Sequence, residues 1–289
     1  MQAGGANVHL AHPLGVKAFE YHRVKNDVRD AQDLADLLRM GRLPEAWIAP
    51  PPTRELRELV RHRAKLVSLR SHSKAEVHAV LAKCGVQVLM SDIFGLAGSE
   101  LLDRLDLPSP YAARIASLCR LMDDLDFEIN LFAGIIRGRM AHEPGYTAVQ
   151  KIPRIGPTLG AVLVAEIGDI TRFTPASKLT CWAGLTPKHH ESDTHARRGR
   201  ITKQGSRLVR WAAIESVKTV SKGSVVGCCG NGSPTAEAAT LARSLPRDAS
   251  WSLSSTRCAT ITYAPWNIYR RWHEHHLRLF PGRRGSCRS

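Results

Sequence analysis

A regular apolar repeat over residues 111–137 restricts the fold of this chain more than any other feature of its sequence. Its apolar residues recur alternately three and four positions apart, and they are Ile115, Leu118, Met122, Leu125, Ile129, Phe132 and Ile136. This spacing keeps one seam of a helix facing a partner helix over about three heptads. We therefore expect a long helix that pairs with a second one, either as a coiled coil or as a two-helix layer of a globular core.

The partner helix is predicted to begin at Thr53, directly after the proline-rich connector LPEAWIAPPP of residues 43–52. From there to about Leu81, apolar residues recur at helical spacing among Arg, Lys and His, and they are Leu56, Leu59, Val60, Val67, Val77 and Leu81. The two helices are expected to run antiparallel. The sequence leaves open whether the pair closes within one chain or between two, and we favour a homo-oligomer.

The charge of the chain favours a polyanionic partner. Lys and Arg number 41 against 26 Asp and Glu, which gives a net charge of +15. Such a surface attracts nucleic acid, although a basic protein without that partner is the alternative. The chain has no run of about 18 apolar residues and no secretory signal pattern, so a cytoplasmic protein without membrane spans is expected. Seven cysteines without a CxxC pair indicate neither a disulfide framework nor a cysteine zinc site.

Residues 26–40 are predicted to form a helix that Asn26 or Asp27 caps and Gly41 ends. Asp27 and Asp30 lie three residues apart in its first turn, and therefore on one face. Two carboxylates so placed can bind Mg²⁺ together, but acids in a first helical turn are also favoured by the helix dipole. The local pattern alone favours the helix start.

A turn in the stretch KIPRIGPTLGAVLVAEIG, residues 151–168, is typical of a helix-hairpin-helix motif. The second helix is expected to turn Leu159, Val162, Leu163 and Ile167 inward. The turn residues Arg154, Ile155 and Gly156 then stand at a helix N-terminus, where backbone N–H groups and the helix dipole favour a phosphate. A purely structural turn is the alternative.

A basic stretch follows from residue 188 to residue 211, and we expect a loop that leads into a helix from Ser206. Its cations are predicted to follow a phosphate backbone, and they are Lys188, Arg197, Arg198, Arg200, Lys203, Arg207 and Arg210. A solvated basic loop is the alternative. Ser192 stands among His189, His190 and His195, and a serine oxygen can attack phosphorus if a base or metal removes its proton. The histidines show no regular spacing of metal ligands.

Several of these motifs occur in the order typical of one family. The stretches KNDVRDAQDLADLL, LRELVRHRAKLV, IPRIGPTLGAVLVAEIGDITRF and KLTCWAGLTPKHHESDTHARRGRITKQGSRLVR resemble bacterial insertion-sequence transposases of the IS110/IS116/IS902 type, to which Piv-type DNA invertases are related. The resemblance covers roughly residues 8–220. Members of this family join a RuvC-like domain with four acids, called DEDD, to a C-terminal domain that carries a serine.

The resemblance implies roles for individual residues. Asp27 and Asp30 would be the last two of four acids that bind Mg²⁺, and Ser192 would attack DNA to form a phosphoserine link. The arginines after Ser192 would bind backbone phosphates, and the Ile155–Gly156 turn would contact DNA or RNA. Family members act as oligomers held by coiled coils, and a structured RNA is thought to guide them. Insertion-sequence ends and target DNA, a guide RNA and further copies of the chain are thus the expected partners.

The expected fold is mainly α, in four parts. Residues 1–50 would be a remnant of the RuvC/ribonuclease-H-like α/β domain, with a remnant strand at Val8–Leu10. Residues 51–145 would form the long coiled-coil pair, and residues 146–222 a helical C-terminal transposase domain with the helix-hairpin-helix motif. Residues 223–289 contain no lysine and have little periodicity, which predicts a poorly ordered tail, either a frameshifted continuation or an Arg- and Ser-rich appendage.

The sequence also leads to an expectation about activity. Before Asp27 the only acid is Glu20, so the first two acids of the expected metal site have no counterpart at the start of this sequence. We therefore expect this chain to be catalytically impaired, because two carboxylates hold Mg²⁺ less well than four. The alternative is a non-catalytic DNA- or RNA-binding remnant that associates with full-length transposase.

Overall fold

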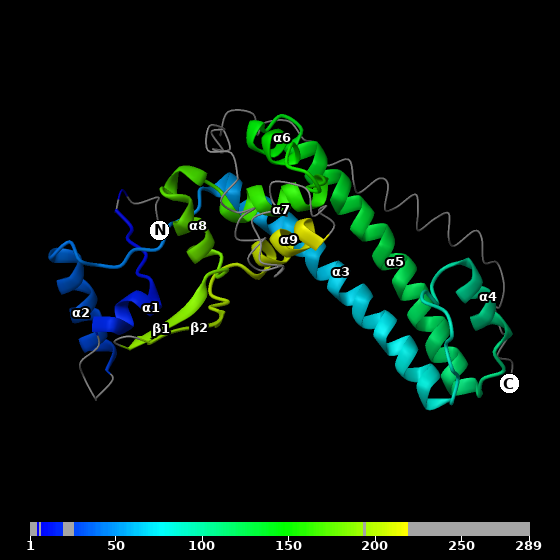
Figure 1. Ribbon diagram of the computed structural model, residues 1–289. Helices are drawn as coiled ribbons and strands as arrows, with labels where there is room; N and C mark the ends of the chain where they lie inside the picture. The colour runs from blue at the N-terminus through cyan, green and yellow to red at the C-terminus, as the bar shows by residue number, and fades with distance from the viewer. Residues whose placement is uncertain (1–4, 6, 20–25, 193–194, 219–289) are drawn as a thin grey trace, which may run out of the picture. The chain divides into compact units, whose positions relative to one another are not determined.

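The structure is a computed structural model that describes residues 7–19, 26–192 and 195–218 together with Gly5. The predicted tail of residues 223–289 lies outside the described residues. The described part is mainly helical, as predicted (Figure 1). Its elements are α1 (Pro13–Val16), η2 (Lys17–Phe19), α2 (Asp27–Arg39), α3 (Pro51–Lys83), α4 (Leu96–Arg104), α5 (Ser109–Met140), α6 (Pro144–Gln150), α7 (Pro157–Ile167), η3 (Ile170–Arg172), α8 (Ala176–Trp182), β1 (Pro187–Ser192), β2 (His195–Ile201) and α9 (Arg207–Lys218).

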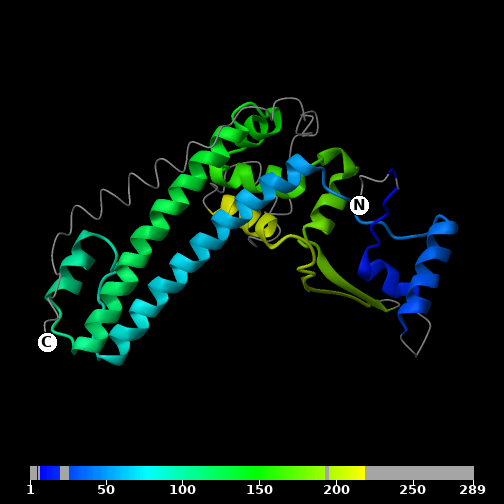
Figure 2. The same cartoon turned by 180° about the vertical axis from the view of Figure 1, so that it is seen from behind.

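Helices α3 and α5 lie side by side and run antiparallel, as Figures 1 and 2 show from opposite sides. Three ion pairs between the helices show this arrangement: Glu55–Arg139, Arg70–Asp126 and Glu76–Arg114. The residue number of the partner in α5 falls as the residue number in α3 rises. The helix pair therefore closes within one chain, which the sequence left open. Coiled-coil packing of the pair stays a prediction.

Of the helices in the described residues, none is long and apolar enough to cross a membrane.

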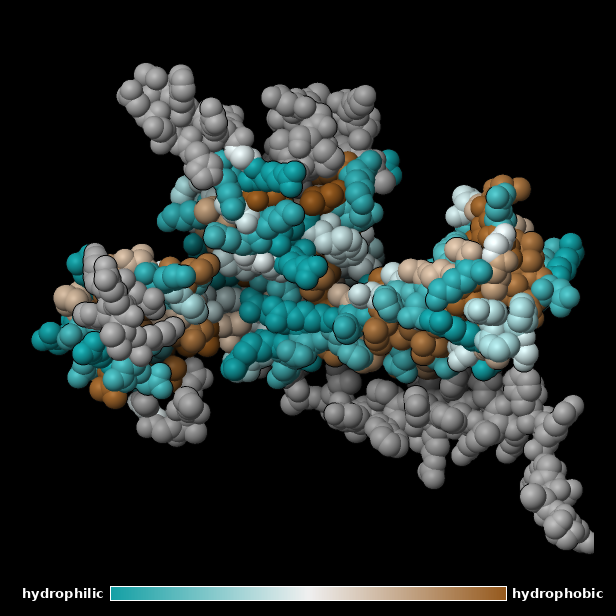
Figure 3. Space-filling view, turned by 90° about the horizontal axis from the view of Figure 1, so that it is seen from below, coloured by the Kyte–Doolittle hydropathy of each residue, from teal (hydrophilic) through white to brown (hydrophobic). Residues whose placement is uncertain are grey.

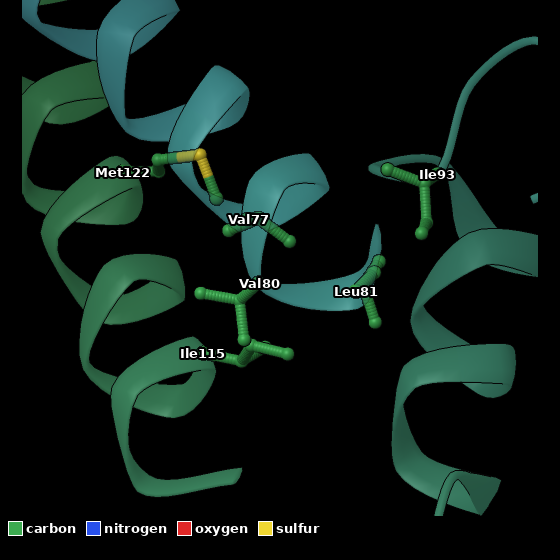
Figure 4. Close-up of a cluster of buried hydrophobic side chains, with 6 residues drawn as sticks. All are labelled: Val77, Val80, Leu81, Ile93, Ile115 and Met122. Atoms are coloured by element: carbon green, nitrogen blue, oxygen red, sulfur yellow. The ribbon is translucent and has the colours of Figure 1, made fainter. Parts of the chain in front are cut away.

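The seam predicted on α5 faces α3. Of its seven residues, Leu118 and Phe132 are half-buried and the other five are buried. Figure 4 shows one cluster along the seam, in which Ile115 and Met122 of α5 meet Val77, Val80 and Leu81 of α3. Ile93, from the segment before α4, completes this cluster. The alternation of three and four residues therefore correctly identified the buried face.

Apolar side chains are exposed at the end of the helix pair that carries α4. Leu89 is 95% exposed and Leu96 is 89% exposed. Figure 3 shows hydrophobic residues gathered at this end, at the right of the view. Exposed apolar groups of this kind are common at protein interfaces. The predicted homo-oligomer nevertheless stays a prediction.

Helix α7 is buried on every side, whereas the sequence predicted one inner face. All residues from Gly160 to Ile167 are buried, and Leu159, which we expected to point inward, is only half-buried. The reason is that α7 contacts α3, α5, α6 and α9. This helix is the centre around which the C-terminal part of the described chain is built.

The prediction of a loop after Lys188 is wrong, because the chain forms an antiparallel hairpin of β1 and β2 there. Sequence reasoning missed it because Pro187, Lys188, Glu191 and Ala196 are of types depleted in strands and Gly199 resembled a loop residue. Helix α9 follows at Arg207, close to the predicted start at Ser206. Near the N-terminus, the predicted strand at Val8–Leu10 is replaced by an isolated bridge between Ala11 and Glu45. In the described residues, β1 and β2 are the only strands.

Helix α2 begins and ends as predicted. The Asn26 side chain accepts a hydrogen bond from the backbone N–H of Val28 at 3.1 Å, and Gly41 has a φ of 65° just beyond the last turn. We expect Asn26→Ala to destabilise α2 by about 1 kcal/mol, because the N–H of Val28 loses its acceptor. Hydrogen exchange of the first-turn amides measures this loss. Asn26→Ser, which keeps an acceptor, is the control and should exchange like the parent; equally fast exchange in both variants would contradict the cap.

Candidate nucleic-acid interface

A buried carboxylate joins α3, α7 and α9. Glu166 on α7 is 3% exposed, and Arg61 of α3 donates to its two oxygens, from Nε at 2.7 Å and from Nη2 at 3.1 Å. The Ser206 hydroxyl, just before α9, donates to the same carboxylate at 3.0 Å. The hydrogen bond with Glu166 is also the main cause that raises the pKa of Arg61. Because one acid holds three elements, it fixes where α9 and its cations begin. Sequence reasoning missed Glu166, although a single acid inside the run AVLVAEIG was a visible signal.

The proline-rich connector is held against the end of α7 by a stack of cations on Trp47. The Arg172 guanidinium carbon lies 3.7 Å from the Trp47 ring centroid, and that of Arg57 lies 5.3 Å away. Burial lowers the pKa of Arg172 to about 10. Gly168 packs directly against the Trp47 ring and leaves no room for a side chain, since a Cβ there would lie 2.5 Å from a ring atom of Trp47. These contacts join the residues before α3 to the C-terminal part.

Two glycines fix the base of the β1–β2 hairpin. Gly184 and Gly205 have φ values of 69° and 81°, and a Cβ on either would lie 2.0 Å or less from a backbone oxygen. The backbone N–H of Thr202 donates to the carbonyl of Thr186 at 3.0 Å, which continues the backbone pairing beyond the ends of the two strands. Arg210 binds the same base, because its Nη1 donates to the carbonyls of Ala183, Gln204 and Gly205. Arg210 therefore has a structural role, and its contact with nucleic acid stays a prediction.

The hairpin brings the predicted nucleophile and the predicted phosphate-binding arginines onto adjacent strands. Ser192 is the last residue of β1, and it pairs in register with His195, the first residue of β2. Further from the tip, His190 pairs with Arg197 and His189 pairs with Arg198. Lys188, Arg200, Lys203 and Arg207 are exposed along the hairpin base and the start of α9. A positively charged ribbon with a serine at its tip is an arrangement able to bind a phosphate backbone.

The turn between α6 and α7 has the helix–turn–helix order that the sequence predicted. Arg154 is exposed and has a φ of 70°, and Gly156 is exposed at the N-cap of α7. Ile155 is 4% exposed and its N–H donates to the carbonyl of Ile152 at 3.2 Å, so this side chain belongs to the interior. A ligand at this turn can therefore reach Arg154 and Gly156 but not the Ile155 side chain. A helix-hairpin-helix contact with nucleic acid stays a prediction.

The two candidate metal ligands lie on the first turn of α2. Asp27 is exposed, and Asp30 is half-buried beside a cavity of about 120 Å³. Carboxylate oxygens suit Mg²⁺, but that ion requires near-octahedral coordination. Within the described ranges, no three His, Cys, Asp or Glu residues are grouped so that they could hold a metal ion. The described residues therefore do not complete a magnesium site.

Comparison with known proteins gives matches over both ends of the described chain. Residues 146–225 match a family model described as "Transposase IS116/IS110/IS902 family", and residues 1–85 match a model of DEDD transposases of the IS110 type. The first match contains most of α6 and all of α7, the hairpin and α9. The second contains α2 and all of α3.

Individual relatives agree with the family models. The chain is 28% identical over 204 residues to y4qE of Sinorhizobium fredii, which is named as a transposase; the match covers 68% of this chain and 48% of y4qE. It is 21% identical over 240 residues to the transposase for insertion sequence element IS1111A of Coxiella burnetii, covering 75% of this chain and 60% of that protein. The chain thus spans about half to three fifths of the length of these relatives. Together with the family models, they show that the chain belongs to the IS110/IS116/IS902 family of insertion-sequence transposases.

Proposed function

We propose that this chain binds DNA in the transposition of an insertion sequence and that Ser192 is the nucleophile of strand cleavage. The observation that carries the proposal is the register of the hairpin, which sets Ser192 opposite His195 with Arg197 and Arg198 further along the same strand. Family membership supports the reaction class. The exposed cations at the hairpin base supply the charge that a phosphate backbone requires.

The proposed step is a transesterification at phosphorus. The Ser192 hydroxyl oxygen attacks the phosphorus of a DNA phosphodiester and forms a new O–P bond, while the bond from phosphorus to one deoxyribose oxygen breaks. The serine proton goes to a base, for which His195 is the candidate by its register position, and the leaving oxygen takes up a proton. Arginines bind the non-bridging oxygens, where negative charge increases. Mg²⁺, implied by the family, would add charge neutralisation, with Asp27 and Asp30 as two of its ligands.

We expect the chain by itself to bind DNA but not to recombine it, because two carboxylates, Asp27 and Asp30, hold Mg²⁺ less well than four. The test is a Mg²⁺-dependent assay on a supercoiled plasmid that carries the element's ends. The expected result is no recombination. Robust recombination that disappears in Ser192→Ala would contradict the expected inactivity and support the nucleophile, whereas recombination that persists in Ser192→Ala would refute the role of Ser192.

The alternative function is that of a non-catalytic module that binds DNA or a structured RNA and associates with full-length transposase. It rests on the same expectation that two carboxylates hold Mg²⁺ less well than four. This alternative predicts that the chain binds nucleic acid with an affinity that falls as salt rises, and that it cleaves none of it. A guide RNA and association with further copies are parts of this proposal that co-purification with labelled RNA and light scattering would test.

Binding itself is expected to depend on three exposed cations, Lys188, Arg200 and Arg207. We expect their joint replacement by Gln to weaken binding of a short DNA duplex and to reduce the slope of log affinity against log salt by about 2 to 3 units, since each phosphate contact contributes about 0.9. Fluorescence anisotropy over a salt series measures this slope. The control replaces Lys83, Arg104 and Arg120, which are exposed near the other end of the helix pair. Equal slopes for the two triple variants would count against the proposed surface.

A further inference from the structure

A pocket of about 640 Å³ lies between α3, α5, α7 and α9, separate from the hairpin. Its floor is apolar and includes Ala64, Ile136 and Val162. Its charged lining residues are all cations, and none of the lining residues is acidic; the cations are Arg61, Arg63, Lys65, Arg137 and Arg207. Its volume falls within the range of about 300 to 1,000 Å³ that is usual for pockets holding drug-sized ligands. A pocket with an apolar floor and cationic walls suits a negatively charged ligand that also has a flat or apolar part.

An aromatic side chain stands at the edge of this pocket. Trp211 on α9 lines it and is 44% exposed. Arg207 lies one turn earlier on the same helix, so an indole and a guanidinium meet at one wall. Nucleobases stack on aromatic side chains of this kind, while neighbouring arginines bind the phosphates on either side.

One cation of the pocket has an unused donor. The Nε of Arg63 is buried and has no hydrogen-bond partner among the residues that the structure describes. Burial, with the nearby Arg70 as a smaller cause, also lowers the pKa of Arg63. A buried donor without a partner costs free energy, which an anionic ligand in the pocket would recover. Arg61 differs, because Glu166 already holds it.

We propose that this pocket receives an unpaired base of a bound nucleic-acid strand, with Trp211 stacking on the base and Arg63, Arg137 and Arg207 binding the adjoining phosphates. The inference rests on the proposed function, because it needs a strand bound to the C-terminal part. It adds that part of this strand is single-stranded or distorted, since a base inside a duplex cannot enter a pocket. A rod-like duplex held only by its phosphates would not need the apolar floor or the indole.

The test compares two single strands of equal charge. The probes are a labelled thymidine oligonucleotide of about 12 nucleotides and a strand of the same length made of abasic sites. The parent protein is expected to bind the thymidine strand about tenfold more tightly, in line with stacking of one base. Trp211→Ala is expected to lose most of this preference, and Trp211→Phe to keep it. Tyr111→Ala, an exposed aromatic on α5 outside the pocket, is the matched control and should leave the preference unchanged.

The outcomes separate this inference from the proposed function. Equal affinity of the parent for both strands, with salt-dependent binding intact, overturns the pocket and leaves the proposed function standing. No salt-dependent binding of either strand overturns the proposed function itself. If Trp211→Ala weakens both strands equally or leaves the preference intact, the base does not stack on Trp211 and the inference is wrong. A uridine strand in parallel distinguishes an RNA source from a DNA source, and a base preference in either supports the pocket.

A second measurement does not depend on how well the variants fold. An oligonucleotide with one 5-iodouracil is cross-linked by light to the parent protein, and the modified peptides are identified by mass spectrometry. Adducts on the α9 peptide that contains Trp211, or on the α6 peptide that contains the other aromatic lining residue, Tyr146, are expected. Adducts confined to peptides outside the pocket lining would overturn the inference.

Discussion

Replacing Arg61 by Met is expected to lower the free energy of unfolding by about 3 kcal/mol. The variant leaves the Glu166 carboxylate buried, at 3% exposure, with the Ser206 hydroxyl as its remaining side-chain donor. Breaking a buried ion pair from one side costs about 3 to 5 kcal/mol, and the lower figure applies because the Arg61 side chain is 52% exposed. Urea denaturation followed by circular dichroism measures the loss.

Two further variants test the physical reason. Arg61→Met combined with Glu166→Gln removes both charges, so it should recover stability to within about 1 kcal/mol of the parent. Arg39→Met removes one member of an exposed pair with Asp36 and should cost less than about 0.5 kcal/mol. If the double variant were as unstable as the single one, the loss would come from packing of the arginine stem and the ion-pair explanation would fail.

Replacing Gly205 by Ala is expected to cost about 3 kcal/mol or more and to disturb the hairpin base. Gly205 has a φ of 81°, and a Cβ there would lie 1.8 Å from the carbonyl oxygen of Trp182. The left-handed backbone costs a residue with a Cβ about 1 to 2 kcal/mol, and relieving a clash with backbone adds about 1 to 3 kcal/mol. The melting temperature and the affinity for DNA should both fall.

Gly199 provides the matched control for this prediction. It lies in β2 of the same hairpin, has no positive φ, and a Cβ there would meet only Lys188 at 3.6 Å, an ordinary contact. We expect Gly199→Ala to melt within a few degrees of the parent and to bind DNA equally well. Equal losses in the two variants would mean that the hairpin tolerates no side chain at either glycine, and the specific clash at Gly205 would not be the cause.

The helix pair could be predicted from the sequence because its burial repeats at a fixed period. Ile115, Met122 and Ile129 recur every seven residues, and all three are buried against α3. The cap at Asn26 and the stop at Gly41 were equally readable, since each depends on local backbone chemistry. What the period could not decide was whether the partner helix came from the same chain, because the same seam fits either.

The parts that the sequence did not predict depend on contacts between distant residues. Helix α7 is buried all round because α3, α5, α6 and α9 contact it, and a run such as AVLVAEIG fits one buried face or several. The hairpin follows from backbone pairing such as Glu191 with Ala196, two residue types that are depleted in strands. The role of Glu166 depends on the meeting of α3, α7 and α9, and the role of Arg210 depends on the meeting of α9 with the hairpin base. A cation in a basic stretch can hold its own fold together as readily as it can bind a phosphate.

The most direct test of the central claim, that the hairpin with Ser192 is where this transposase chain holds DNA, is hydrogen exchange with and without bound DNA. We predict added protection of the paired amides of β1 and β2 and of the first turn of α9. Residues 83–120, at the other end of the helix pair, should exchange unchanged. Protection confined to that other end, with the hairpin exchanging as it does in the free protein, would contradict the claim.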